Sequence, residues 1–134
     1  MDAELIRRVW ERARHRCEYC QLPQAADERI FEIDHVIARK HRGRSDIENL
    51  ALSCFRCNSS KGSDIAGLDP ESEKLTPLFN PRRQAWTRHF RWDGPWLVDR
   101  TAAGRVTVVL LRINDASRVE LREVLIDEGV FPSE

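Results

Sequence analysis

The chain has 134 residues, of which 41% are hydrophobic, so it is long enough for one small domain with its own core. The 22 basic and 22 acidic residues give a formal net charge of zero, which excludes the strongly basic body of a nonspecific nucleic-acid coat protein. No run of about 18 apolar residues occurs, and the N-terminus lacks an apolar signal segment. We therefore expect a soluble, cytoplasmic protein with no membrane partner.

The first half of the chain is expected to form a helix, a two-stranded hairpin and a second helix. Residues 3–15 carry apolar side chains at helical spacing after Asp2, which is a suitable N-cap. Residues 31–38 and 47–53 are the expected strands of the hairpin, joined by a glycine-containing loop. Residues 54–64 then predict a tight turn followed by a short helix.

The second half predicts a connector, a hairpin and a last helix. Residues 66–83 are rich in proline and show little periodicity, which indicates an extended connector. Residues 95–101 and 105–113 flank a three-residue segment that ends in glycine, and this pattern predicts a hairpin with its loop at 102–104. A helix is expected from a cap at Asp115 to about residue 127. Its expected apolar face consists of Leu121, Val124 and Leu125.

Four cysteines occur as two Cys-x-x-Cys pairs, Cys17/Cys20 and Cys54/Cys57. In a reducing compartment such pairs are more often metal ligands than disulfides, and two pairs supply the four thiolates of a closed tetrahedral zinc site. A thioredoxin-like redox pair would explain only one of the two, and buried thiols are the other alternative. The spacing therefore predicts a structural zinc, and the chemistry has to come from other residues.

The dipeptide Asp34-His35 lies between the cysteine pairs and has the residue types that metal-assisted hydrolysis needs. A neutral imidazole can take a proton from water near pH 7, so His35 is the candidate general base. Asp34 is a hard oxygen ligand for a divalent ion, and Asn58 offers a second oxygen from the start of the helix. Neighbouring residues on a regular strand point to opposite faces, so a shared site requires a distorted strand end facing the helix. Asn49 is expected to bond backbone groups across the loop and hold the imidazole in place.

Two basic stretches suit contacts with phosphate. The loop after His35 has four cations and no acid, and Lys61 follows Asn58 by one helical turn. The residues expected to bind the nucleic-acid backbone, without reading sequence, are Arg39, Lys40, Arg42, Arg44 and Lys61. The second stretch combines Arg82, Arg83, Arg88 and Arg91 with aromatic residues. For it, nucleic-acid binding and a solvated surface stay equal alternatives. Tryptophans could stack on the bases of single strands, but we expect His89 and the four tryptophans to pack in the core, namely Trp10, Trp86, Trp92 and Trp96.

The run from Cys17 to Cys20, followed by EIDHVIARKHRGRSDIENLALSCFRCNSSKG at 32–62, resembles the HNH endonucleases. The resemblance implies a ββα-metal fold, two strands and a helix around one metal, within an α+β domain. It implies that His35 is the base, that Asp34 and Asn58 hold the catalytic metal, and that Asn49 orders the loop. The family often has histidine where this chain has Asn58. Because a neutral amide oxygen suits hard cations, Mg²⁺ or Mn²⁺ is favoured.

We therefore expect one domain over 1–134, with an HNH core at about 17–62 and a C-terminal appendage at about 78–128. We expect this domain to cleave DNA, and the DNA to be double-stranded. Two other classes stay open: a non-catalytic zinc module that binds nucleic acid, and a zinc-stapled protein-interaction domain. A base beside a hard metal ligand has no use in a binding module, so Asp34-His35 favours the enzyme. The zero net charge suggests that an unknown protein partner adds affinity for DNA.

Overall fold

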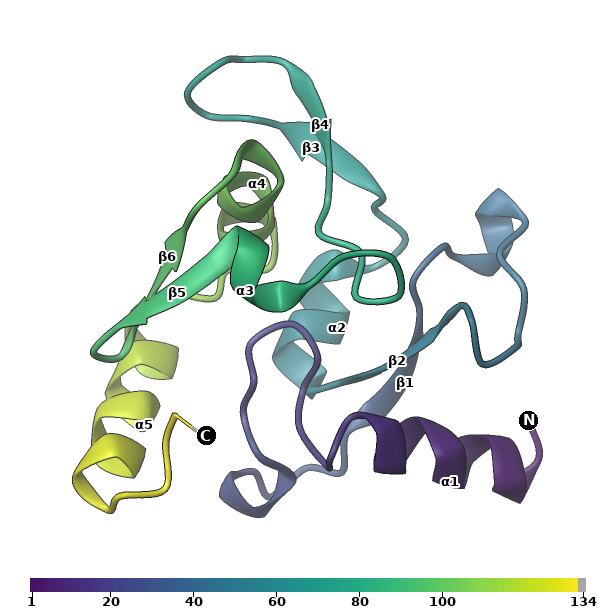
Figure 1. The fold of residues 1–134 in the computed structure, drawn as a ribbon, viewed down its shortest axis with the longest axis horizontal. Helices are drawn as coiled ribbons and strands as arrows, with labels where there is room; N and C mark the ends of the chain where they lie inside the picture. Colours follow the sequence, from purple (N-terminus) through teal and green to yellow (C-terminus); the bar gives the residue numbers. More distant parts are fainter. Residues whose placement is uncertain (133–134) are drawn as a thin grey trace.

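The computed structural model describes residues 1–132 and confirms a small α+β fold made of helices and short antiparallel hairpins (Figure 1). In chain order the elements are α1 (Ala3–Arg12), η1 (Gln24–Ala26), β1 (Glu32–His35), η2 (Arg39–His41), β2 (Leu50–Ser53), α2 (Phe55–Lys61), β3 (Ala66–Leu68), β4 (Leu75–Pro77), α3 (Trp86–His89), β5 (Phe90–Asp93), β6 (Trp96–Asp99), α4 (Ala102–Leu110) and α5 (Ala116–Asp127). Each strand pairs with its neighbour in the chain: β1 with β2, β3 with β4, and β5 with β6. No helix among the described residues is long and apolar enough to cross a membrane.

The first hairpin and its two helices match the predicted order but are shorter. The Asp2 carboxylate accepts from the Leu5 N–H at 2.7 Å and so caps α1, as predicted. β1 ends at His35 because the backbone of Ile37 no longer meets a strand partner. Its N–H and C=O bond instead to the Asn49 side chain, each at 2.9 Å. The Asn49 side chain thus takes the place of a backbone partner strand at Ile37, where the loop begins.

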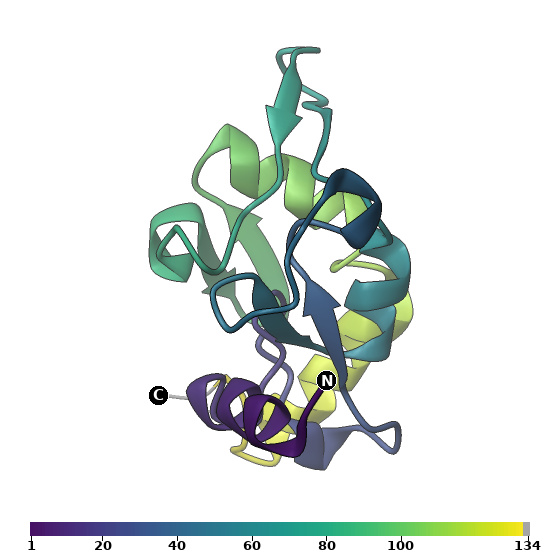
Figure 2. The same cartoon turned by 90° about the vertical axis from the view of Figure 1, so that its right-hand side faces the viewer.

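The connector prediction for 66–83 was wrong in part, because β3 and β4 form a hairpin that projects from the body in both views (Figures 1 and 2). Gly67 lets this hairpin approach α4 closely: a Cβ there would come within 2.5 Å of Leu110 Cδ1. Arg105 on α4 also holds Asp69, in the loop of the hairpin, with two hydrogen bonds of 2.7 and 2.8 Å. Both contacts join residues far apart in sequence, so the local pattern does not predict them.

The predicted second hairpin was also misplaced. The structure pairs β5 with β6 across Gly94, which has a left-handed φ of +56°. Residues 102–110 are helical instead: the Thr101 hydroxyl caps α4 by accepting from the Gly104 N–H at 3.1 Å. The β-branched residues after Gly104 favour a strand locally, but packing against β6 and the β3–β4 hairpin decides for a helix.

The last helix, α5, occupies the predicted range, and Leu125 is buried as predicted, but the other two residues of the predicted apolar face are not. Leu121 and Val124 are exposed. The buried residues of α5 are Arg118, Val119, Arg122 and Leu125. Hydropathy alone does not place two arginines on a buried face, so the expectation followed the apolar residues instead.

The aromatic residues of the second basic stretch largely fill the core, as expected. The indole N–H groups of Trp86 and Trp92 donate to Tyr19 O at 2.9 Å and to Gln21 Oε1 at 3.0 Å. His89 is buried beside Phe79, with Nδ1 at 2.6 Å from the Thr101 hydroxyl. Trp96 departs from the expectation, because about half of it is exposed. Arg82 from the same stretch pairs with Glu18.

Candidate functional site

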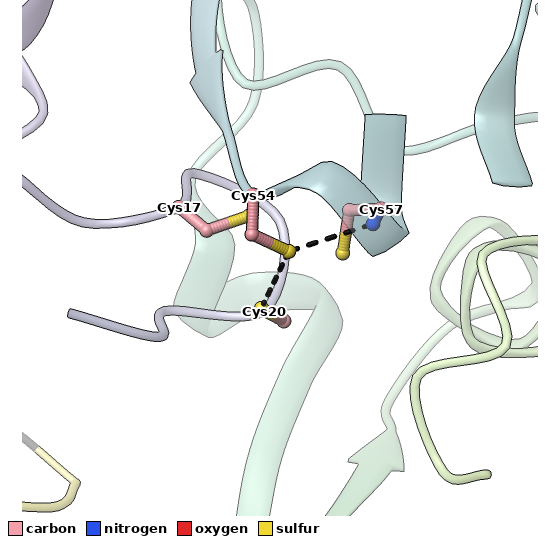
Figure 3. A group of neighbouring side chains, drawn as sticks. All are labelled: Cys17, Cys20, Cys54 and Cys57. Atoms are coloured by element: carbon pink, nitrogen blue, oxygen red, sulfur yellow. Dashed lines mark hydrogen bonds between the residues drawn. The ribbon is translucent and has the colours of Figure 1, made fainter. Parts of the chain in front are cut away.

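The four cysteines converge on one buried point between the loop after α1 and the start of α2 (Figure 3). Their sulfur atoms all lie within 4.8 Å of one another, and Cys20 Sγ is 3.8 Å from Cys54 Sγ. Zn–S bonds of ~2.3 Å in a tetrahedron imply S···S separations of ~3.8 Å. The Cys57 N–H also points at Cys54 Sγ at 3.4 Å, within the tight turn expected of a knuckle. The donor set and its spacing therefore fit a structural zinc.

The end of β1 lies against the end of α2, and Asp34 is buried between them. The Asp34 carboxylate accepts a 2.5 Å hydrogen bond from the Tyr19 hydroxyl. It also forms an ion pair with the Lys61 ammonium at 3.2 Å. Burial raises the pKa of Asp34 above its usual value, while the Lys61 charge and the Tyr19 hydrogen bond act in the opposite direction. Lys61 also donates to the His35 backbone oxygen at 3.2 Å. One ammonium group therefore ties both residues of the Asp34-His35 dipeptide to α2.

The His35 imidazole faces the loop rather than α2. Its Nε2 lies 2.8 Å from the Ser45 hydroxyl, and pairing along β1 is continuous from Glu32 to His35. Asp34 and His35 are neighbours at the strand end, but their side chains contact different partners, Lys61 and Ser45. The end of β1 lies against α2 as expected, but the expected distortion of the strand is absent, because the β1–β2 register runs without interruption from Glu32 to His35.

Asn49 makes the cross-loop hydrogen bonds expected of it. In addition to its two bonds to Ile37, its Nδ2 donates to the Arg44 backbone oxygen at 2.8 Å. Arg44 directly precedes Ser45, the partner of the imidazole. The Asn49 side chain therefore fixes both ends of the loop, and through Ser45 it fixes the environment of His35.

Comparison with known proteins supports the family that the motifs resemble. The family model described as HNH endonuclease matches residues 17–64. This segment is an HNH domain. A search of curated proteins found the Septu protein PtuB of Bacillus thuringiensis, 25% identical over 118 residues, which covers 87% of this chain and 43% of that protein. The chain thus spans less than half the length of this relative. No solved structure matches at a significant level.

Within the HNH domain, two further candidate site residues, Asn58 and Lys61, lie on α2. Asn58 is half-buried in α2, and within residues 1–132 no hydrogen bond joins its side chain to Asp34. Lys61 is 2% exposed, and its ammonium is engaged by Asp34. This geometry gives no support to the phosphate contact expected of Lys61 and assigns its charge to Asp34 instead.

The basic loop of the HNH domain is exposed, as phosphate contacts require. The cations concerned are Arg39, Lys40, Arg42 and Arg44. The loop includes the short helix η2, and Arg42 ends it in a left-handed conformation with φ +69°. Arg44 also pairs with Asp46 at 2.9 Å. The four charges therefore project into solvent beside the strand end that carries His35.

Replacing Gly43 with alanine is expected to lower the free energy of unfolding by roughly 1 to 3 kcal/mol. The reason is steric, because a Cβ at Gly43 would lie 1.6 Å from Ile37 O and 2.9 Å from Asn49 Nδ2. Denaturant unfolding measures the effect. Gly94→Ala is the control: its φ is positive but its Cβ meets nothing within 4 Å, so a loss of about 1 kcal/mol is expected there. Equal losses would mean that the loop has no tight contact at Gly43.

Tyr19, Ser45 and Arg118 belong to the site and were not predicted from the sequence. Tyr19 lies inside the first Cys-x-x-Cys pair, and its hydroxyl reaches Asp34. Arg118 is contributed by α5 and contacts the cysteine cluster. Each of these contacts depends on the tertiary fold, and no motif spacing marks it. The position of Tyr19 between two ligand cysteines was the only available signal.

Proposed function

We propose that the chain is a metal-dependent endonuclease that hydrolyses phosphodiester bonds of DNA, with His35 as the general base. The observation that carries this proposal is the HNH strand end, where an imidazole held by Ser45 follows a buried carboxylate tied to α2. An imidazole used only for structure would not need an exposed basic loop and a hard oxygen ligand beside it. The proposal therefore rests on the combination and not on the histidine alone.

The proposed metal ligands are Asp34 and Asn58, which offer hard oxygen atoms of the kind that Mg²⁺ and Mn²⁺ prefer. A carboxylate has about four lone-pair sites, so the contacts of Asp34 with Tyr19 and Lys61 leave capacity for an ion. When bound, the ion would act as a Lewis acid on the scissile phosphate. In the proposal Tyr19 and Lys61 hold the Asp34 carboxylate in a fixed orientation.

The base needs a ring nitrogen with a free lone pair. In the proposed arrangement the His35 Nε2–H donates to the Ser45 hydroxyl, which leaves Nδ1 to take a proton from water. The loop that carries Ser45 is held by Asn49, so Asn49 acts by positioning and does not touch the reacting atoms. This division of roles explains why one asparagine side chain makes three backbone hydrogen bonds.

The exposed loop is the proposed contact with DNA. Its cations are Arg39, Lys40, Arg42 and Arg44, and they would bind phosphates without selecting a sequence. Double-stranded DNA is the proposed substrate. Because the net charge of the chain is zero, the affinity of the isolated domain should be modest and steeply dependent on salt. We propose that a protein partner contributes further affinity.

Incubation with supercoiled plasmid tests the proposal. We expect nicking with Mg²⁺ or Mn²⁺ and none after the divalent ion is chelated, with the extent of cleavage read from agarose gels. Salt-dependent binding to duplex DNA without cleavage under either metal would contradict catalysis and favour a zinc module that only binds nucleic acid. Absence of binding at low salt would favour a protein-interaction domain, because a protein platform releases no counterions.

A further inference from the structure

A buried arginine of α5 points directly at the cysteine cluster. Arg118 is 6% exposed, and its Nη2 lies 2.9 Å from Cys57 Sγ and 4.0 Å from Cys54 Sγ. Its Nη1 donates to the backbone oxygens of Leu111 at 2.7 Å and Arg112 at 3.2 Å. The two carbonyl groups hold one edge of the guanidinium, so its other edge faces the sulfur atoms.

A buried guanidinium has lost its hydration and is stabilised by hydrogen-bond acceptors, most strongly by an anionic one. The ion pairs recorded near α5 join Arg56 and Arg112 to Asp115, and within residues 1–132 no carboxylate pairs with Arg118. Four thiolates around one Zn²⁺ carry a net charge of about two minus. The cysteine cluster is therefore the anion that matches the position of this cation.

We propose that Arg118 is the counter-charge of the zinc-thiolate cluster and makes α5 part of the zinc site. Hydrogen bonds from N–H groups to ligand atoms orient those ligands and stabilise their charge, and such partners typically contribute 10- to 100-fold in metal affinity. The coupling works in both directions. The guanidinium helps to retain the zinc, and the zinc-bound thiolates keep α5 docked on the HNH domain through Arg118.

The chain provides a matched control on the same helix. Arg122 follows Arg118 by about one turn and is 3% exposed. Its guanidinium donates to the backbone oxygens of Pro95 and Ile113 at 2.7 and 2.9 Å and to Asn114 Oδ1 at 3.1 Å, and none of these contacts is to sulfur. Replacing Arg122 therefore removes a buried guanidinium of the same size and leaves the contact between Arg118 and sulfur in place.

The test compares Arg118→Met with Arg122→Met. Purified proteins are assayed for zinc per chain and for the rate of zinc transfer to a chromophoric chelator under native conditions. We expect Arg118→Met to release zinc roughly 10- to 100-fold faster than wild type. Arg122→Met should release zinc at nearly the wild-type rate although its melting temperature falls. Equal acceleration in both variants would overturn the proposal, because it would reflect loosening of α5 in general.

A spectroscopic readout separates contact with sulfur from packing, and it does not depend on nuclease activity. In cobalt-substituted protein, the thiolate-to-metal charge-transfer band should shift in Arg118→Met and stay unchanged in Arg122→Met, because only Arg118 touches a sulfur atom. Arg118→Gln, which keeps a polar side chain but loses the charge, serves if the methionine variant does not fold. An unshifted band and wild-type zinc release in Arg118→Gln would also overturn the proposal.

Discussion

Replacing His35 with alanine is expected to lower the rate of DNA cleavage by roughly 10²- to 10⁴-fold, the usual contribution of a general base. The domain should stay folded, because the imidazole side chain is only half-buried and its one recorded hydrogen bond within residues 1–132 is to Ser45. Rates of plasmid nicking at saturating Mg²⁺ or Mn²⁺ measure the effect. Zinc content and melting temperature close to wild type would show that the loss is chemical.

Two variants in the same loop sharpen this test. His41→Ala removes an exposed histidine from the basic loop, so we expect at most a weaker affinity for DNA with the cleavage rate of bound substrate retained. Ser45→Ala keeps the imidazole but removes its partner, and a loss smaller than that of His35→Ala is expected. Cleavage by His35→Ala at the wild-type rate would exclude this histidine as the base and would move the chemistry elsewhere in the HNH domain.

The zinc ligands and the HNH hairpin were predictable because their signals are local. Cys-x-x-Cys places two thiols on one turn, and the spacing of the two pairs across a hairpin brings all four together. The Asp34-His35 pair and Asn49 lie within the same short segment, where hydrophobic spacing already predicts strands and a loop. In residues 17–64, local sequence patterns therefore predict both the site residues and the strands and helix that carry them.

The C-terminal half was harder to predict because its structure depends on contacts between distant residues. α4 contains a β-branched run that locally favours a strand, yet Thr101 caps it and Gly104 packs against the His89 backbone oxygen, where a Cβ would come within 2.3 Å. The Thr101 cap was the local signal for this helix. Arg118 and Arg122 carried no such signal, because a buried cation is stable only beside acceptors that the sequence cannot locate.

The same reasoning limits what the motif shows about Lys61. Its place one turn after Asn58 suggests a surface contact with substrate, but the structure buries its ammonium between Asp34 and the His35 backbone oxygen. A lysine at the end of a short helix next to a carboxylate of the adjacent strand becomes part of the scaffold. Our proposal therefore assigns phosphate binding to the exposed loop cations, which are separate from the groups that contact the Asp34 carboxylate.

Replacing Cys57 with serine is expected to abolish the cooperative fold of the domain and not merely its activity. Cys57 is completely buried at the start of α2, where it contacts Arg118. Structural zinc sites in small domains bind with apparent free energies of roughly 10 to 16 kcal/mol at pH 7. This is similar to or larger than the total stability of a typical domain, about 5 to 15 kcal/mol. Loss of one ligand should therefore leave little or no folded protein at 37 °C, as measured by circular dichroism and thermal melting.

Metal removal from the wild-type protein separates the two proposed metal sites. A short treatment with a chelator that removes Mg²⁺ or Mn²⁺ should stop cleavage while the melting curve stays unchanged, because an ion held by only two protein ligands keeps several of its waters and contributes little to the fold. Release of the zinc by a thiol-reactive mercurial should instead unfold the protein, and refolding should require added Zn²⁺ after the mercurial is removed. A zinc-free Cys57→Ser protein that melts at the wild-type temperature would show that the apolar core alone supports the fold, and the four thiols would then need another explanation.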